Sequence, residues 1–311
     1  MIGDELLGRV EAGGLIAGPE PVVAMLSGGR DSVCMLDLAV RARGAEEVTA
    51  LHVDYGLREE AGEDERHCVS LCDRLGVRLE IERPRRPDGP GNLQAWAREE
   101  RYAAAARLAE RAKATIVTGH TADDQVETIL YRLASSPSRR ALLGMRPKDG
   151  RLARPLLGTT REEITIYCEA RGLGWRDDVS NDEAGYKRNL VRRDLIPELT
   201  EIHPAARQNV LRTAALLREE AELLDSLVDA ELGEVGEGDP SISRERFAGL
   251  HPALRRLVLQ RLADEAAGSP VAGAARFAEQ VAGLTRGGSR LDLGGGIQAV
   301  LEGGILRAER R

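Results

Sequence analysis

Short apolar runs alternate with helix-like stretches along the first 135 residues. Four runs have the length and composition of buried strands, at residues 22–26, 48–53, 77–81 and 115–118. Helical spacing or composition predicts helices around residues 33–40 and at 59–75, 92–112 and 123–133. Strands that alternate with helices predict an α/β fold, in which helices cover both faces of a parallel sheet. Such sheets bind ligands at the carboxyl ends of their strands.

The pattern changes after about residue 200, where a long helix is expected. His203-Pro204 is the predicted start, because proline suits the first helical position. The apolar face of this helix is expected to consist of Val210, Leu211, Ala214, Leu217, Leu224 and Leu227. The chain therefore divides, on pattern alone, into residues 1–205 and residues 206–311.

The second part is predicted to be mostly helical with a short β element. A segment rich in glycine and acids, residues 233–240, interrupts the pattern, and residues 252–267 predict another amphipathic helix. Leu291 and Leu293 alternate with polar residues, and residues 300–306 form a Gly-Gly hairpin pattern. We expect this smaller domain to contact the substrate of the first.

Composition indicates a folded protein of the reducing cytoplasm. The chain has 311 residues, of which 42% are hydrophobic, so a sizeable core can form and wholesale disorder is excluded. It contains no apolar run of about 18 residues, so no membrane association is expected, and the amino terminus does not resemble a signal peptide. None of the four cysteines forms a CxxC pair, which favours free thiols.

Charge is unevenly distributed along the chain. The net charge of −7 argues against a general nucleic-acid coat. Residues 132–154 nevertheless hold seven basic side chains and one acid, Asp149. This stretch could bind a polyanion, although a solvated arginine-rich loop would have the same composition.

The most specific motif is a glycine-rich turn between the first strand and its helix. It consists of Ser27, Gly28, Gly29, Arg30, Asp31 and Ser32. Glycines allow a tight turn with exposed N–H groups, and the helix amino terminus adds orphan donors and a partial positive charge. Phosphate is therefore the predicted ligand of this turn.

Asp31 is an unusual neighbour for phosphate because its carboxylate repels an anion. An acid at this position suits Mg²⁺ binding or proton transfer. The turn lacks the lysine of a Walker A loop, and it does not contain the GxGxxG fingerprint of dinucleotide-binding proteins. A simple serine-capped turn remains the structural alternative.

The segment VAMLSGGRDSVCMLDLA resembles the PP-loop of the N-type ATP pyrophosphatases. The resemblance implies an adenine nucleotide alpha hydrolase-like, Rossmann-like domain that cleaves ATP between its α and β phosphates. It also implies that AMP is transferred to an oxygen of the substrate, with Mg²⁺ as cofactor. The six residues of the turn would bind the nucleotide, together with His52 and Gly119, and Asp31 would hold the metal.

Further motifs narrow the resemblance to the tRNA(Ile)-lysidine synthase family. They occur in order at residues 51–58, 92–102, 119–128, 154–157, 175–181 and 188–192. The likeness extends from about residue 20 to 220. It implies that C2 of the wobble cytidine in the CAU-anticodon isoleucine tRNA is adenylated. Free L-lysine then displaces AMP to give lysidine.

Acidic and basic side chains in these motifs suit that chemistry. Asp124 and Glu127, with Asp123 beside them, share a helix face where a strand ends, and could hold Mg²⁺ or the lysine ammonium, or accept its proton. Acids at a helix amino terminus are also ordinary dipole partners.

Candidate arginines for phosphate or RNA are Arg98, Arg101, Arg188 and Arg192, although solvation or ion pairing would equally explain their presence. His120 could line the pocket or be structural. The catalytic set is Asp31, Arg98, Asp124, Glu127 and Arg192.

The chain departs from the family pattern at several positions. Asp54, Tyr55 and Thr121 stand where the family usually has Asn, His and His, and residues 134–140 replace a glycine-containing loop. These changes leave the glycine-rich turn untouched. They leave open the roles of the two loops in which they lie.

Other functions remain as alternatives. A tRNA thiolase of the same fold would need a reactive cysteine or a cluster, whereas Cys34, Cys68 and Cys72 have the pattern of small buried residues. An NAD synthetase fits the basic stretch and the second domain less well. A nucleotide-binding module without catalysis would need no acidic pair. A homodimer is possible, since small helical domains often pair.

Overall fold

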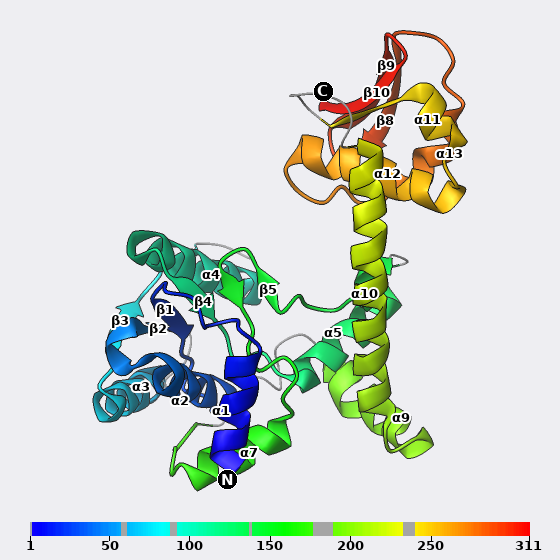
Figure 1. Cartoon of the computed structure of the whole chain (residues 1–311). Helices are drawn as coiled ribbons and strands as arrows, with labels where there is room; N and C mark the ends of the chain where they lie inside the picture. Colours follow the sequence, from blue (N-terminus) through cyan, green and yellow to red (C-terminus); the bar gives the residue numbers. More distant parts are fainter. Residues whose placement is uncertain (1, 57–60, 88–91, 137–138, 177–188, 233–239) are drawn as a thin grey trace. The chain divides into compact units, whose positions relative to one another are not determined.

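The computed structural model describes residues 2–56, 61–87, 92–136, 139–176, 189–232 and 240–311. These form two compact units, of which the first ends at Ala215 and the second begins at Leu216 (Figure 1). The sequence pattern changes near residue 205, where helix α10 (Ala206–Leu232) begins. The two units divide within that helix.

A six-stranded, mostly parallel sheet forms the centre of the first unit (Figure 1). Its strands, in spatial order, are β3 (Arg78–Glu82), β2 (Val48–Val53), β1 (Val22–Met25), β4 (Thr115–Val117), β6 (Leu152–Ala153) and β5 (Lys148–Asp149). All neighbours pair in parallel except β5 and β6. The parallel α/β prediction is confirmed, whereas the short β5–β6 pair has no pattern long enough to predict it.

Helices cover both faces of this sheet, because the buried β1 strand points its side chains alternately to each side. Val22 and Ala24 belong to one hydrophobic cluster with Leu36 of helix α2 (Arg30–Arg43). Val23 and Met25 belong to another, which includes three alanines of helix α4 (Leu93–Ala112). Small alanine side chains let α4 lie close to the sheet.

The helices of the first unit follow the predicted spans closely where a prediction existed. They are α1 (Ile2–Ala12), α2 (Arg30–Arg43), α3 (Ala61–Leu75), α4 (Leu93–Ala112), α5 (Ala122–Ser135), α6 (Arg139–Leu142), α7 (Arg161–Ala170), the π-helical segment η3 (Val191–Leu195) and α9 (Ile196–Ile202). Caps explain two sharp starts. Asn92 accepts from the backbone N–H groups of Gln94 and Ala95, and Thr121 forms a capping box with Asp124.

The start of α10 differs from the prediction. The helix begins at Ala206, and Pro204 lies in the preceding turn, where His203 Nδ1 accepts from the Ala205 N–H at 3.1 Å. The short helix α9 already ends before this turn, so the proline separates two helices. The prediction that Leu227 lies on the apolar face of this helix is also wrong. Leu227 is 45% exposed, and its neighbour Val228 is buried.

The second unit contains more sheet than its sequence pattern suggests. Strands β7 (Ser241–Ser243), β10 (Ile305–Arg310), β9 (Ile297–Glu302) and β8 (Ser289–Gly294) form an antiparallel sheet in that order. Helices α11 (Arg244–Gly249), α12 (Pro252–Ala267) and α13 (Ala278–Ala282) accompany it. The hairpin predicted at residues 303–304 and the helix predicted at 252–267 are confirmed. Strand β7 is too short to show alternation.

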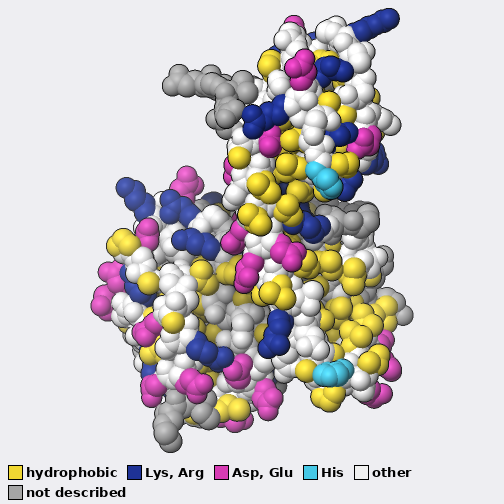
Figure 2. Space-filling view, turned by 45° about the vertical axis from the view of Figure 1, so that its right-hand side comes forward, with side chains coloured by type: hydrophobic (Ala, Val, Ile, Leu, Met, Phe, Trp, Pro, Cys, Tyr) yellow, Lys and Arg dark blue, Asp and Glu magenta, His cyan; other side chains and the backbone are white. Residues whose placement is uncertain are grey.

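Several large apolar side chains of the first unit are exposed. Leu133 on α5, Leu195 on η3 and Ile202 on α9 have exposed fractions of 57%, 40% and 80%. Figure 2 shows hydrophobic side chains gathered over part of this surface. None of the described helices combines the length and hydropathy needed to span a bilayer.

Candidate active site

The glycine-rich turn lies at the carboxyl end of β1, as predicted. Gly28 has a φ of 85°, a conformation that a glycine adopts without strain. The Ser32 hydroxyl donates to the Gly29 carbonyl at 2.8 Å and accepts from the Ser27 N–H at 3.1 Å. Ser27 is exposed, and α2 begins at Arg30 with no side-chain cap. The turn therefore presents an uncapped helix amino terminus and the exposed hydroxyl of Ser27 to a ligand.

Gly119 is required for the end of β4 to reach this turn. A Cβ atom at Gly119 would lie 2.7 Å from the Asp31 backbone carbon and 2.9 Å from the Ser32 nitrogen. Backbone atoms cannot yield as a flexible side chain can. Its predicted place in the nucleotide site is therefore one of close backbone approach.

His52 supports the turn from inside. It is 5% exposed, and its Nδ1 lies 3.0 Å from the Leu26 carbonyl oxygen and 3.5 Å from the Cys68 sulfur. This placement favours a buttress for the residue before the turn. It does not bring the ring to the exposed side where a nucleotide would lie.

Three of the predicted acids meet around a residue that the sequence reasoning missed, Arg161. Its guanidinium lies 2.6 Å from Asp124, 3.4 Å from Glu127 and 3.6 Å from Asp31. The Arg161 backbone N–H also donates to Asp123 at 2.9 Å. One arginine at the start of α7 thus connects the helix after β1 with the helix after β4.

Burial and charge act against each other in this cluster. Burial raises the pKa of Asp31, and the nearby Arg161 guanidinium partly offsets that rise. The pKa of Glu127 is raised for the same reason. Burial would lower the pKa of Arg161, but the carboxylates of Asp124 and Glu127 outweigh it and the net shift is upward. The guanidinium thus favours the ionised form of Asp31 and Glu127 against the effect of burial.

Two further arginines border the acids. Arg192 approaches Glu127 at 3.7 Å from η3, with its side chain 44% exposed. Arg207 donates to Asp123 at 2.8 Å from the first turn of α10. Arg192 therefore pairs with an acid of the site, which is the ion pairing that competes with its predicted binding of phosphate or RNA. Its companion Arg188 lies outside the described residues, as do residues 177–181 of the predicted motif.

Arg30 turns away from the open side of the turn. Its guanidinium donates to Thr165 at 2.9 Å and to Asp31 at 3.3 Å. It thus ties α2 to α7 and neutralises part of the charge of Asp31. The guanidinium would have to exchange these partners to reach a phosphate.

A second group, which is basic, gathers around Tyr102. Arg98 and Arg101 flank the Tyr102 ring, with their guanidinium carbons 5.0 Å and 5.6 Å from its centre. Arg154 is only 8% exposed, and the charges of both Tyr102 and Arg98 influence its pKa. Among the described residues, no ion pair joins Arg98 to the predicted catalytic acids.

His120 is influenced by both the acidic and the basic groups. Burial lowers its pKa to about 4, with Arg154, Arg101 and Arg98 adding to the effect and Asp124 opposing it. Its Nδ1 lies 2.7 Å from the Thr118 hydroxyl. At neutral pH the imidazole is thus neutral, and it can donate or accept one hydrogen bond in the site.

The basic stretch of residues 132–154 is not one surface patch. Arg154 is buried and donates to the Arg146 carbonyl at 2.6 Å. Arg132 donates to the Gly144 carbonyl at 2.8 Å. The prediction overestimated the positive charge available on the surface. The sequence does not distinguish an arginine that donates to backbone carbonyls from one that is solvated. Arg140, Arg146 and Arg151 are exposed.

Two of the departures from the family pattern have a local explanation. Thr121 is fully buried and caps α5, a role that suits a threonine better than a histidine. Tyr55 packs edge-on against Trp96 of α4, with ring centres 5.9 Å apart. An aromatic pair thus stands where a histidine was expected.

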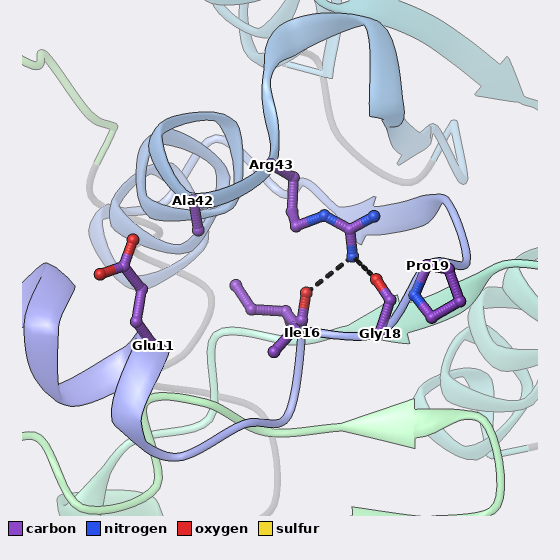
Figure 3. A pocket seen from close by; sticks show the side chains of 7 residues that line it. Glu11, Ile16, Gly18, Pro19, Ala42 and Arg43 are labelled. Carbon is purple, nitrogen blue, oxygen red and sulfur yellow. Dashed lines mark hydrogen bonds between the residues drawn. The ribbon is translucent and has the colours of Figure 1, made fainter.

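The hollow in Figure 3 lies near the amino end of β1, whereas the glycine-rich turn lies at the carboxyl end of that strand. It has a volume of about 500 Å³ and is lined by residues 16–19 with Glu11, Ala42 and Arg43. Arg43 donates to the carbonyls of Ile16 and Gly18, the first at 2.8 Å. This region precedes β1, whereas the predicted site follows it. We place the active site at the acids and arginines, because their side chains can take part in catalysis, and not at this open hollow, whose size alone would favour it.

Comparison with known proteins agrees with the motif and the fold. The PP-loop domain family matches residues 14–199, which is more than half of the chain. The chain therefore belongs to the PP-loop family of ATP-using proteins.

Relatives with curated names point to one branch of that family. A tRNA(Ile)-lysidine synthase of Thermus thermophilus is 37% identical over 302 residues, covering 94% of this chain and 57% of its own. One from Chromobacterium violaceum is 40% identical over 216 residues, covering 66% of this chain and 49% of its own. The chain thus spans about half the length of these relatives.

A solved structure confirms the fold. The U34-tRNA thiolase NcsA of Methanococcus maripaludis, described with its [4Fe-4S] cluster, superposes with a TM-score of 0.59. It covers 70% of this chain and 79% of its own, at 18% identity. At that identity the likeness concerns architecture alone.

Proposed function

We propose that the protein joins L-lysine to C2 of the wobble cytidine in the isoleucine tRNA with a CAU anticodon, and that it acts in the cytoplasm. The cytidine C2 oxygen attacks the α-phosphorus of ATP, and pyrophosphate leaves. An amine of lysine then attacks C2, loses a proton and displaces AMP. The observation that best supports this is the cluster of Asp31, Asp124 and Glu127 around Arg161, directly beside an open PP-loop.

Binding of ATP would use the turn at residues 27–32. The amino terminus of α2 and the exposed Ser27 hydroxyl can receive the phosphates. Arg98, exposed on α4 and without a carboxylate partner among the described residues, can stabilise charge that develops on phosphate during adenylyl transfer. His52 and Gly119 would keep the turn in position.

Mg²⁺ fits this site through Asp31. Within the described ranges, no three His, Cys, Asp or Glu side chains are arranged to hold a metal by themselves. Mg²⁺ is commonly held by one or two carboxylates together with substrate phosphates and water, so one partly exposed carboxylate is sufficient. When bound, the ion would neutralise phosphate charge.

Asp124 and Glu127 are suited to the lysine ammonium. They are three residues apart on α5 and face the same point. Either carboxylate can accept the proton that the amine loses. Arg161 must yield part of its contact when a second cation arrives.

A thiolase is less well supported by the cysteines of this chain. Burial raises the pKa of both Cys68 and Cys72 to about 12. Such thiols are poor nucleophiles at neutral pH. All four cysteines are buried and free.

Pyrophosphate release provides the test. Purified protein is incubated with ATP and Mg²⁺, with lysine and bulk bacterial tRNA added singly and together. We expect release that requires tRNA, and labelled lysine in the tRNA fraction only when both are present. Pyrophosphate release that is the same with and without tRNA, or incorporation of sulfur in place of lysine, would contradict the proposal. A homodimer and tRNA contacts from the second domain belong to the same proposal and can be checked by sedimentation and cross-linking.

A further inference from the structure

The peptide between Gly28 and Gly29 is held by a residue from outside the glycine-rich turn. The Arg176 N–H, in the segment that follows α7, donates to the Gly28 carbonyl at 3.0 Å. The carbonyl and the N–H of a trans peptide point in opposite directions. The Gly29 N–H therefore points away from Arg176, and it lies 3.4 Å from the hydroxyl of the exposed Ser27. The contact with Arg176 thus fixes the direction of one N–H group of the turn.

Helix α3 packs against the same peptide. A Cβ atom at Gly28 would lie 3.4 Å from the Cys68 sulfur and 3.9 Å from the Asp64 carbonyl oxygen. A Cβ atom at Gly29 would lie 3.8 Å from the Arg176 carbonyl oxygen. The two glycines are therefore in contact with both α3 and Arg176, so the position of Arg176 relative to α3 decides how the turn is held.

The Arg176 side chain ties its own segment to that helix. Its guanidinium donates to Asp64 at 2.5 Å and to Glu63 at 2.9 Å, and both acids belong to the first turn of α3. A guanidinium that bonds two carboxylates is fixed in direction as well as in place. The side chain is 35% exposed, so the pairs add little to the stability of the whole unit. Their effect is local, on the Arg176 N–H beside the turn.

We propose that Arg176 is a positioning residue for ATP, which acts through its ion pairs with Asp64 and Glu63. The pairs keep the Arg176 N–H on the Gly28 carbonyl, and so keep the turn in the form that binds phosphate. Without them, only a fraction of the molecules has this form, and the apparent affinity for ATP falls by that fraction. The inference rests on the proposed function and adds the residue that keeps the turn ready for ATP.

Titration calorimetry with ATP and Mg²⁺, in the absence of tRNA and lysine, tests this role. Calorimetry reports Kd separately from the folded fraction, which appears in the stoichiometry. Arg176→Gln keeps the backbone N–H but removes both ion pairs, and it should raise the Kd of ATP about three- to tenfold. Arg176→Lys retains the charge and should restore part of the affinity. In the full reaction, Arg176→Gln should raise the KM of ATP while the KM of lysine and kcat at saturating ATP stay unchanged.

Arg74→Gln is the matched control. Arg74 also lies on α3 and contacts the same segment, but its guanidinium donates to the Gly172 carbonyl at 3.2 Å. The variant therefore loses a contact between α3 and this segment without losing the pairs of Arg176. It should leave the Kd of ATP unchanged.

Asp64→Asn separates positioning from direct binding of phosphate by Arg176. Removal of an acid near the turn would, by charge alone, strengthen the binding of an anion, and it would free the guanidinium for phosphate. The positioning role predicts the opposite, a Kd of ATP about two- to fivefold higher. Because both substitutions break the same pair, the double variant should bind ATP no more weakly than Arg176→Gln alone.

Two results would overturn the assignment while leaving the proposed function intact. One is an unchanged Kd of ATP in Arg176→Gln, even if its Tm falls, because the ion pairs would then be merely structural. The other is unchanged or tighter binding of ATP by Asp64→Asn, because Arg176 would then not act through Asp64. A wild-type protein that binds no ATP would instead refute the proposed function.

Discussion

Replacing Arg161 by glutamine should destabilise the first unit and make its stability depend on pH. The change removes a cation that Asp31, Asp124 and Glu127 share. Loss of one partner from a buried ion pair costs about 3–5 kcal/mol. The Arg161 side chain is 21% exposed and its partners 15–23%, so water offsets part of that cost. We expect a loss of about 2–3 kcal/mol.

The pH dependence follows from the directions of the pKa shifts. Burial raises the pKa of Glu127 and Asp31, and Arg161 opposes the rise. Without Arg161 both pKa values rise further. A carboxyl whose pKa is higher in the folded than in the unfolded protein favours folding only while it is protonated, and this contribution is lost as the pH rises through the folded pKa. The variant should therefore be most destabilised at neutral and alkaline pH.

Calorimetry in metal-free buffer between about pH 5 and pH 8 measures both effects. A loss of this size lowers Tm by roughly 4–12 °C for a unit of this length. Arg9→Gln, which removes an exposed pair to Glu163 at 2.8 Å, is the control and should cost under about 1 kcal/mol. If Arg161→Gln costs no more than this control, or if its cost is independent of pH, Arg161 does not favour the ionised form of Asp31 and Glu127.

Three further outcomes are expected. Gly119→Ala forces a Cβ against backbone of the turn; it should cost about 1–3 kcal/mol and weaken ATP binding in calorimetry, whereas Gly62→Ala, on α3 in open space, should be neutral or stabilising. Asp31→Ala should abolish adenylation, measured by pyrophosphate release, while ATP affinity falls only modestly; equal turnover would remove Asp31 from the reaction. Neutralising Arg139 and Arg140 together should weaken tRNA binding and lower the slope of its salt dependence by about one unit per lost phosphate contact. An unchanged slope would place α6 outside the interface.

Much of the fold follows from the sequence because the central strands are short, buried and apolar. The strands β1 and β2 and their helices are bounded by glycines and caps that can be recognised without coordinates. Strands β5, β6 and β7 have two or three residues each, too few to show a period. Their existence depends on partners far away in the chain.

The candidate site could be predicted where a motif holds its own residues together. The glycine-rich turn and the α5 acids are local patterns, and the structure places them at one sheet edge. Arg161 could not be found in this way, because it lies 34 residues after Glu127 and follows a threonine that looks like an ordinary cap. Its only sequence signal was a lone arginine at the start of a helix, where a positive charge is unfavourable.

Burial decides the remaining differences. Arg154 belongs by sequence to a basic stretch, yet its guanidinium is enclosed beside Tyr102 and His120. His52 lies near the carboxyl end of β2, at the same end of the sheet as the turn, but its ring packs behind the turn against the Leu26 carbonyl. Neither distinction is visible from spacing, since both depend on which side of a loop the tertiary structure covers.

Mass spectrometry of tRNA nucleosides after reaction tests the central claim most directly. Isoleucine tRNA with a CAU anticodon is incubated with the protein, ATP, Mg²⁺ and lysine, digested and compared with a reaction lacking lysine. We predict that one cytidine per tRNA gains a lysine residue, only when ATP is present. An unmodified wobble cytidine, or one whose oxygen has been replaced by sulfur, would contradict the account.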